Sequence, residues 1–316
     1  NTVYDSRDNC NALIKTSENK LIKGCYNTVI PATVTSIANK AFINCQRLKS
    51  IEIPAGVTQI GEFAFYDCSG LTSIEIPTSV TQIGANAFMY CRLSSITFEE
   101  NSQLKTIGDD AFWDCDYINS IVLPSGVTSI GNSAFRGCDG LSFVDIPSSL
   151  TFIGDEAFYN CPIRYMICHV ETPITLTSDP GSNPDLTVFV PANSVDDYKE
   201  AYPWSDYNIL PIDPASVAIT LNHEDGGTVT GAGNYCKSME ITVTATPNKG
   251  YDFIGWKEDG DIVSNDSRYQ FVINYNKNLE AIFELSKYWN PDIYLYPNTM
   301  NIVAEVKVDD VLQNST

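Results

Sequence analysis

Apolar residues in the first half of the chain recur with a period of 23 or 24 residues. The clearest sign is the motif Ala-Phe-x-x-Cys, which occurs six times. Its cysteines are Cys45, Cys68, Cys91, Cys115, Cys138 and Cys161. A fixed period in this range is typical of a solenoid, because one repeat cannot bury its apolar face alone and neighbouring repeats must stack.

A single repeat shows which elements to expect. Residues 51–54 read Ile-Glu-Ile-Pro, so apolar and polar positions alternate as in a strand that proline then ends. The next apolar positions fall at i, i+3, i+4 and i+7, which predicts about two helical turns. These positions are Gly61, Ala64, Phe65 and Cys68. Each coil is therefore predicted to hold a short strand, a turn, a brief helical segment and a return.

One repeat departs from the pattern. The proline that follows the strand at residues 31, 54, 77, 124 and 147 is absent after Phe98. Glu99 and Glu100 stand there instead, and this repeat carries two extra residues before its Ile-Gly pair.

The cysteine column is predicted to be core packing. Stacked strands lie about 4.8 Å apart, which is within reach of a disulfide by Cα separation. Side chains in register point the same way, however, so the required S–S torsion is hard to form. A zinc site is also disfavoured, because tetrahedral ligands must converge whereas a ladder runs parallel. A small buried thiol fits the position.

The second half of the chain changes character after Pro214. Residues 217–285 contain five stretches of strand-like alternation separated by turn residues. Residues 286–316 also alternate, but about thirty residues are too few for an independent core. We expect them to extend the preceding sheet or to begin a further domain.

Composition excludes several function classes. The chain has 39 acidic and 19 basic residues and a net charge of −20, which disfavours nucleic acid and anionic lipid as partners. No stretch of 18 apolar residues is present, so we expect no transmembrane segment. The sequence begins at Asn1, so any leader or anchor is expected outside it. With two histidines and no nucleophile elbow, zincin helix or Walker loop, we expect no enzyme, no cofactor and no metal site.

The repeats resemble a known family. The pattern I-x-I-P-x-x-V-x-x-I-G-x-x-A-F-x-x-C-x-x-L is similar to the BspA-like leucine-rich repeat of bacterial surface proteins and covers residues 28–166. Residues 1–27 and 167–213 resemble the caps of such a region, which would cover the end coils. The resemblance implies an α/β, strand-rich fold, with residues 1–213 forming a leucine-rich-repeat solenoid of six coils.

The amino-terminal cap is expected to be a hairpin. With its turn at Thr16-Ser17-Glu18-Asn19, Ile14 opposes Leu21 and Cys10 opposes Cys25. That cysteine pair is the one plausible disulfide, although two free thiols are favoured.

Residues 214–285 are similar to a second family, the divergent internalin-type B-repeat. This is a small, strand-rich module, and the resemblance implies a ubiquitin-like (β-grasp) fold. Tyr251, Phe253 and Trp256 match its GYxFxGW core signature, and Ser238 stands where the module usually has glycine.

Two outward columns of the solenoid are candidate binding surfaces, since the inward positions are needed for the core. The position after each ladder phenylalanine is largely aromatic, and the position between the strand isoleucines is partly acidic. The ligand-binding candidates are Tyr66, Trp113 and Tyr159 in the first column and Glu52, Glu75 and Asp145 in the second. The alternatives are packing between coils for the aromatics and a solvated face for the acids.

The resemblance implies a secreted or surface-anchored bacterial protein that binds rather than catalyses. We expect adhesion to host or matrix proteins, or to other cells, through the repeat surface, with the second module as a spacer or auxiliary binder. The alternative is capture of a cell-surface glycan on the exposed aromatics. We expect the protein to be a monomer.

Overall fold

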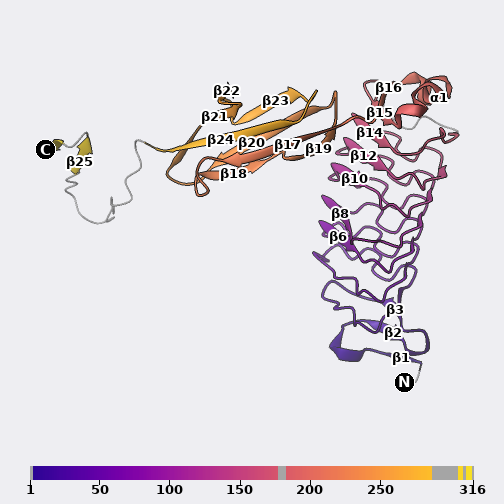
Figure 1. Cartoon of the computed structure of the whole chain (residues 1–316). Coiled ribbons are helices and arrows are strands. Elements are labelled where there is room, and N and C mark those ends of the chain that lie inside the picture. The colour runs from indigo at the N-terminus through magenta and orange to yellow at the C-terminus, as the bar shows by residue number, and fades with distance from the viewer. Residues whose placement is uncertain (1–2, 177–182, 287–304, 309–310, 315–316) are drawn as a thin grey trace. The chain divides into compact units, whose positions relative to one another are not determined.

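The computed structural model describes residues 3–176, 183–286, 305–308 and 311–314 (Figure 1). The chain divides into two compact units, Asn1–Asp213 and Pro214–Thr316.

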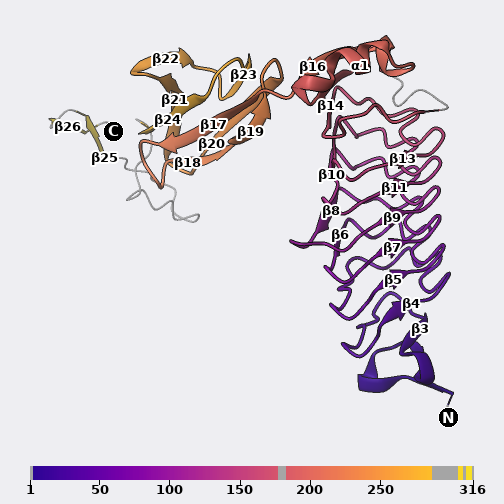
Figure 2. The same cartoon turned by 45° about the vertical axis from the view of Figure 1, so that its right-hand side comes forward.

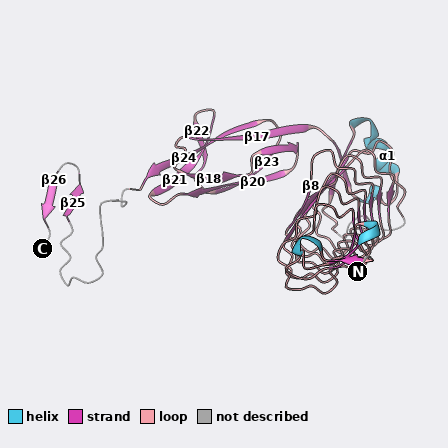
Figure 3. Cartoon of the chain, turned by 90° about the horizontal axis from the view of Figure 1, so that it is seen from below, coloured by secondary structure: helices cyan, strands magenta, loops and turns pink. Residues whose placement is uncertain are grey.

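The first unit is a solenoid whose coils stack in register, as the repeats predict (Figures 2 and 3). One column of two-residue strands runs through all six repeats, each strand ending in the repeated isoleucine. These strands are β4 (Ser36–Ile37), β5 (Gln59–Ile60), β7 (Gln82–Ile83), β9 (Thr106–Ile107), β11 (Ser129–Ile130) and β13 (Phe152–Ile153). Neighbours pair in parallel, so that isoleucine lies beside isoleucine along the whole stack.

A second column of strands lies on another side of the coils. It contains β6 (Ser73–Ile76), β8 (Ser95–Phe98), β10 (Ser120–Val122), β12 (Phe143–Ile146) and β14 (Tyr165–Cys168). The first repeat has no assigned strand at residues 51–53. This column forms two separate parallel sheets, one of β6 and β8, and one that starts at β10.

The predicted helical turns are replaced by a run of hydrogen-bonded turns. In the second repeat Phe63 and Asp67 have left-handed φ values of 56° and 51°, whereas a helix needs negative φ throughout. The amide N–H groups of Phe63 and Phe65 donate to carbonyl oxygens of the next coil, at 2.9 and 2.7 Å. Ala64, Phe65 and Cys68 still point into the core. The spacing therefore identified the buried face correctly and the backbone conformation wrongly.

The ladder phenylalanines form one continuous stack of rings. Neighbouring ring centroids are 4.9–5.4 Å apart, and their planes differ by at most 10°. All six side chains are fully buried: Phe42, Phe65, Phe88, Phe112, Phe135 and Phe158. The stack runs through every repeat, so the coils share one core.

The cysteine column adds a hydrogen bond that the repeat pattern did not predict. Each of five thiols donates to the carbonyl oxygen of the ladder phenylalanine one coil earlier, with S···O distances of 2.9–3.2 Å. These five buried residues are Cys68, Cys91, Cys115, Cys138 and Cys161. Cys45 is only partly buried. No ladder phenylalanine precedes Phe42 in the sequence, so this thiol has no equivalent acceptor.

The ladder thiols are expected to be unreactive in the native protein. Burial raises the pKa of Cys68 to about 12 and holds that of Cys115 well above its usual range, which suppresses the nucleophilic thiolate. Iodoacetamide at pH 8 without reductant should modify the partly exposed Cys25 and Cys45 first. The five buried thiols should react only after denaturation. Mass spectrometry that found Cys115 modified as fast as Cys25, or linked to a neighbouring cysteine, would contradict this expectation.

The amino-terminal cap is the expected hairpin. The strands β2 (Leu13–Lys15) and β3 (Lys20–Lys23) are antiparallel and pair Ile14 with Leu21, as predicted. The register shifts by one residue at Leu13, which pairs with Lys23, so the predicted register does not continue towards Cys10 and Cys25. The strand β1 (Tyr4–Asp5) and the 3-10 turns η1 (Arg7–Asn9) and η2 (Thr16–Glu18) complete the cap. Cys10 and Cys25 are both free thiols.

Gly24 lies directly on the end of the phenylalanine stack. A Cβ atom at this position would be 2.1 Å from the ring atom Cε1 of Phe42, so any side chain would displace the ring. The backbone of the cap therefore closes the core at its first coil.

The carboxy-terminal cap continues the second strand column. The strands β15 (Thr187–Val190) and β16 (Asn208–Pro211) pair in parallel after β14. The helix α1 (Val195–Glu200) and the turns η3 (Ala192–Ser194) and η4 (Trp204–Asp206) lie between them in sequence. Tyr198 and Trp204 are fully buried and donate to the carbonyl oxygens of Val170 and Ile174, at 3.0 and 2.8 Å. Two large aromatic residues thus cover the last coil without leaving their polar atoms unpaired.

The second unit is built from two sheets. One has the order β19-β17-β24-β21-β22 and the other β18-β20-β23. The bounds are β17 (Pro214–Leu221), β18 (Gly227–Thr230), β19 (Gly233–Cys236), β20 (Glu240–Pro247), β21 (Tyr251–Glu258), β22 (Asp261–Ser264), β23 (Arg268–Val272) and β24 (Lys277–Leu285). Residues 214–286, which are described throughout, contain no helix. The module is β-rich, as the resemblance implies.

The aromatic signature of this module lies in its core. Trp256 is fully buried, and the ring of Phe253 lies 5.5 Å from it and 5.6 Å from Phe283. Tyr251 is partly buried at the start of β21. Ser238 has a φ of 75°, which explains why glycine is usual at this turn.

The expectation for residues 286–316 falls mostly outside the described residues. The two described segments, β25 (Glu305–Val308) and β26 (Val311–Asn314), pair with each other in antiparallel fashion.

Candidate functional site

The acidic column lies on the second strand column, and most of its side chains reach solvent. Glu75 is exposed on β6, and Glu52 is exposed one coil earlier. Asp145 differs from them, because its carboxylate on β12 is partly buried and lies 3.0 Å from Nε2 of His169. Burial raises the pKa of Asp145, and His169 opposes that shift. Glu52 and Glu75 are therefore the more accessible acids.

The aromatic column packs largely on itself. The guanidinium of Arg136 lies 5.2 Å from the ring centroid of Trp113 and 5.1 Å from that of Tyr159, and it also forms an ion pair with Glu156. Tyr66 makes an edge contact with Tyr90 at 5.6 Å between centroids. Arg136 thus occupies ring surface that a sugar would need for stacking. This column belongs to the turns of each coil, so it does not join the acids of the strand column.

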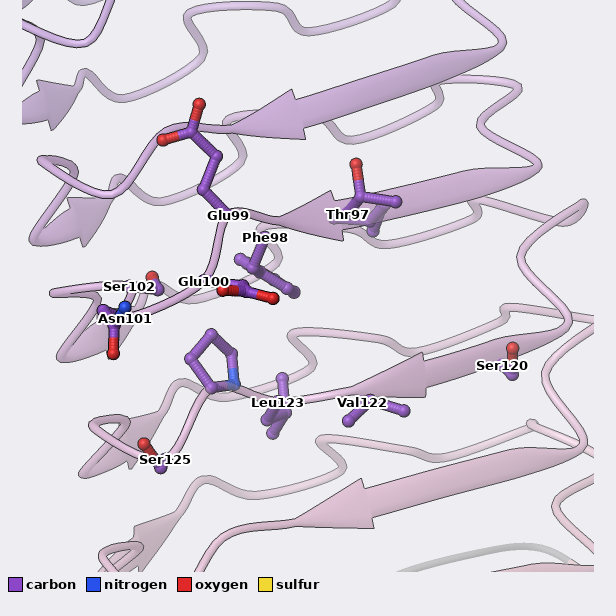
Figure 4. A pocket seen from close by; sticks show the side chains of 12 residues that line it. Thr97, Phe98, Glu99, Glu100, Asn101, Ser102, Ser120, Val122, Leu123 and Ser125 are labelled. Atoms are coloured by element: carbon purple, nitrogen blue, oxygen red, sulfur yellow. The ribbon is translucent and has the colours of Figure 1, made fainter. Parts of the chain in front are cut away.

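A pocket opens where the irregular repeat interrupts the second strand column (Figure 4). Its volume is about 540 Å³, and it is lined by residues of β8, β10 and the connections that follow them. Ile96 and Leu123 are nearly buried at its floor, whereas Thr97, Ser120 and Val122 are exposed along the strands. The pocket therefore has an apolar floor and a polar rim.

The two extra residues explain why the pocket forms. The preceding repeat passes from Ile76 to Val80 through Pro-Thr-Ser, whereas this repeat passes from Phe98 to Leu104 through five residues. The longer connection stands where neighbouring coils would otherwise pack closely. Residues 93–125 are described throughout, and no backbone hydrogen bond joins β8 to β10. Figure 4 shows the two strands spread apart, with the side chains of Phe98 and Glu100 between them.

Two glutamates line this pocket, and the carboxylate of Glu99 is turned towards the preceding coil (Figure 4). Oε2 of Glu99 accepts hydrogen bonds from the backbone N–H of Thr78 at 2.8 Å and from its hydroxyl at 2.9 Å. These bonds lower the pKa of Glu99, which keeps the group ionised and fixed in place. Glu100 is exposed beside it. The pocket therefore favours a cationic or hydrogen-bond-donating ligand.

The described residues contain no group of three or more histidine, cysteine or acidic side chains placed to hold a metal ion. Among the same residues, no helix is both long and apolar enough to span a membrane.

Acidic residues near Trp113 should make stability depend on pH. Burial is the main cause that raises the pKa of Asp110, Asp114 and Asp116, and neighbouring carboxylates such as Asp139 add to it, while nearby arginines oppose it. A raised pKa means that the folded state binds protons more readily than the unfolded state. Stability from this source is complete below the ordinary aspartate pKa of about 3.9 and is lost as pH rises through the folded values.

The urea midpoint of the native chain, relative to that of Asp114→Asn, should therefore rise as pH falls from 7 towards about 3.9, the ordinary aspartate pKa. The lowered pKa of Glu99 acts in the opposite direction, because its ionised form is bonded only in the folded state, but Glu99 is present in both proteins and its effect cancels in the comparison. A difference between the two midpoints that does not change with pH would contradict the expectation.

The pocket was missed from sequence, although its signal was visible. The absent proline and the two extra residues marked an irregular coil, but the candidate residues were chosen from the regular columns. Of those six candidates, none lines this pocket.

Comparisons with known proteins agree with the fold. Residues 35–164 match the family model described as BspA type leucine rich repeat region, in six copies. Residues 217–287 match the divergent InlB B-repeat domain. No curated protein matches the chain. Both families are typical of bacterial surface proteins, and neither is a family of enzymes.

Several solved structures are similar. A leucine-rich repeat protein of T. pallidum is 26% identical, with a TM-score of 0.40, and the match covers 52% of this chain and 82% of that one. One from Bacteroides ovatus is 21% identical, with a TM-score of 0.38 and coverage of 71% and 72%. The pneumococcal vaccine antigen PcpA is 18% identical, with a TM-score of 0.42, and the match covers 67% of this chain and 48% of the antigen. The chain therefore contains a BspA type leucine-rich repeat region of six copies, which a divergent InlB B-repeat domain follows.

Proposed function

We propose that this protein is a non-catalytic adhesin of the bacterial surface that binds a basic segment of a host or matrix protein, or of another cell. The observation that carries the proposal is the exposed acidic surface of the second strand column. Glu52 and Glu75 are exposed there, and Glu99 and Glu100 stand at the pocket in the same column. The B-repeat module would act as a spacer or an auxiliary binder.

Charge supports a basic partner over an acidic one. The net charge of −20 produces a negative potential that steers cationic surfaces towards the protein and repels nucleic acid. The family supports a binding role for the repeats. A glycan ligand is less well supported, because Arg136 already packs on the rings of Trp113 and Tyr159.

Arrays of matrix proteins and of glycans, probed with the same sample of the full chain, would identify the ligand. If the ligand is a basic protein, Glu52→Gln combined with Glu75→Gln should raise the Kd about 2- to 30-fold, since each exposed charge pair contributes about 0.2–1 kcal/mol. The matched control is Glu224→Gln with Glu284→Gln, which removes the same charge from exposed positions of the second unit.

A glycan ligand would give a different result. Binding should then be insensitive to the glutamate variants and be lost with Trp113→Ala and Tyr66→Ala. If neither pair of variants changes the affinity, the strand column and the aromatic column are both excluded, and the proposed surface is wrong.

A further inference from the structure

Backbone pairing in the second strand column is interrupted at one place, between β8 and β10. The strands β10, β12, β14, β15 and β16 form one sheet, and β6 and β8 form another. The first strand column, by contrast, is continuous through β7, β9 and β11 at the same level of the stack. The first strand column thus joins the coils at this level. In the second strand column, one edge of β8 and one edge of β10 face each other without backbone partners.

Unpaired strand edges are templates for another strand, because each presents a row of N–H and C=O groups. Natural sheets usually cover such edges or block them with proline or bulges. Here the proline that follows the strand in most repeats is missing after Phe98, and the edges border a pocket of about 540 Å³. We propose that an extended peptide segment of a partner protein, with alternating apolar and basic side chains, binds in this gap as an added strand between β8 and β10.

The chemistry of the pocket sets the pattern of that peptide. Successive side chains of a strand point to opposite faces. One set would contact the apolar floor at Ile96 and Leu123, which are 9% and 5% exposed. The other set would face Glu100, which is exposed and whose side chain lies between the two strands (Figure 4). A peptide whose apolar side chains point inward and whose lysine or arginine side chains point outward would complement both surfaces.

Binding by an added strand takes most of its affinity from main-chain hydrogen bonds, and its specificity from the side-chain pockets. The bound segment would connect β6-β8 to β10-β12-β14-β15-β16 as one sheet. This inference rests on the proposed function, because it names the form in which the basic partner is recognised.

The test uses the full chain and a random heptapeptide display library. Selection is carried out on the native protein, with counter-selection on a variant in which residues 99–103 are replaced by Pro-Thr-Ser, the connection of the preceding repeat. Enriched peptides are synthesised in three forms: unmodified, N-methylated at the odd-numbered residues, and N-methylated at the even-numbered residues. N-methylation removes backbone donors and leaves side chains and charge unchanged.

We expect enriched peptides to alternate apolar and basic residues, and N-methylation in one of the two registers to raise the Kd at least about tenfold, as the loss of two or three backbone hydrogen bonds predicts. Hydrogen exchange on the native protein should show new protection of amides in residues 95–98 and 120–122 when the unmodified peptide binds. This measurement needs no variant, so it stands even if the replaced connection does not fold.

Three results would overturn the inference: no enrichment over the counter-selection, equal affinity for both N-methylated registers and the unmodified peptide, or protection confined to other strands. The ligand that the arrays identify shows whether only the strand-addition inference fails or the proposed function fails as well. If its affinity falls with Glu52→Gln and Glu75→Gln while none of the strand-pairing results is seen, the acidic surface binds and the gap does not. If the glutamate variants have no effect, the proposed function itself fails.

Discussion

Phe112→Ala is expected to lower the free energy of unfolding of the solenoid by about 3–5 kcal/mol, the usual cost of a large-to-small change in a packed core. The Phe112 ring is fully buried between those of Phe88 and Phe135, at centroid distances of 5.3 and 5.2 Å. A cavity there also weakens the contact between neighbouring coils, on which a repeat protein depends. Urea unfolding followed by circular dichroism would measure the change.

Phe152→Ala is the matched control for this prediction. Phe152 lies on β13 in the same solenoid but is 51% exposed, so its loss should cost much less. A change below about 1 kcal/mol for Phe112→Ala, or equal changes for the two variants, would mean that the ring stack does not carry the core.

Trp204→Ala should have a comparable effect at the carboxy-terminal cap, about 3–5 kcal/mol for the lost packing. The side chain is fully buried, its ring lies 5.5 Å from that of Tyr198, and Nε1 donates to the carbonyl of Ile174 at 2.8 Å. Trp204→Phe keeps most of the apolar volume and removes the donor, so it should cost only the unpaired carbonyl, about 1–3 kcal/mol.

Hydrogen exchange would show where this damage lies. In a stacked protein the loss of a cap should open β15 and β16 first and leave β5 and β7 protected. If Trp204→Ala and Trp204→Phe behave alike, the indole volume does not close the core. If the first coils lose protection equally, the solenoid unfolds as one unit and the stabilising effect of the cap is not confined to the last coils.

The regular part of the fold could be predicted from the sequence because the same residue types recur in every coil. Isoleucine, phenylalanine and cysteine at fixed spacing identified the inward face. The backbone of the Ala-Phe-x-x-Cys segment could not be predicted from that spacing, since positions i, i+3, i+4 and i+7 also share a face in this run of turns. A weaker signal did exist. The residue before each ladder cysteine has a left-handed φ in every repeat, and asparagine, aspartate or glycine fills most of these positions. They are Asn44, Asp67, Tyr90, Asp114, Gly137 and Asn160.

Contacts between coils were the least predictable part. The thiol of Cys115 reaches the carbonyl of Phe88, which is 27 residues away, and that contact depends on the stagger of the coils. Arg136 stacks between Trp113 and Tyr159, which come from the two neighbouring repeats. The pocket between β8 and β10 arises from an insertion, and a repeat pattern describes only what is regular.

The measurement that tests the account most directly is a salt titration of the ligand that the arrays identify. The account predicts that the Kd of the native chain rises steadily with sodium chloride, because exposed charge pairs are screened over about 8 Å at physiological ionic strength. In the variant with Glu52→Gln and Glu75→Gln, the Kd should be higher at low salt and the slope smaller. An affinity that is independent of salt, and unchanged in that variant, would contradict binding through the acidic strand surface.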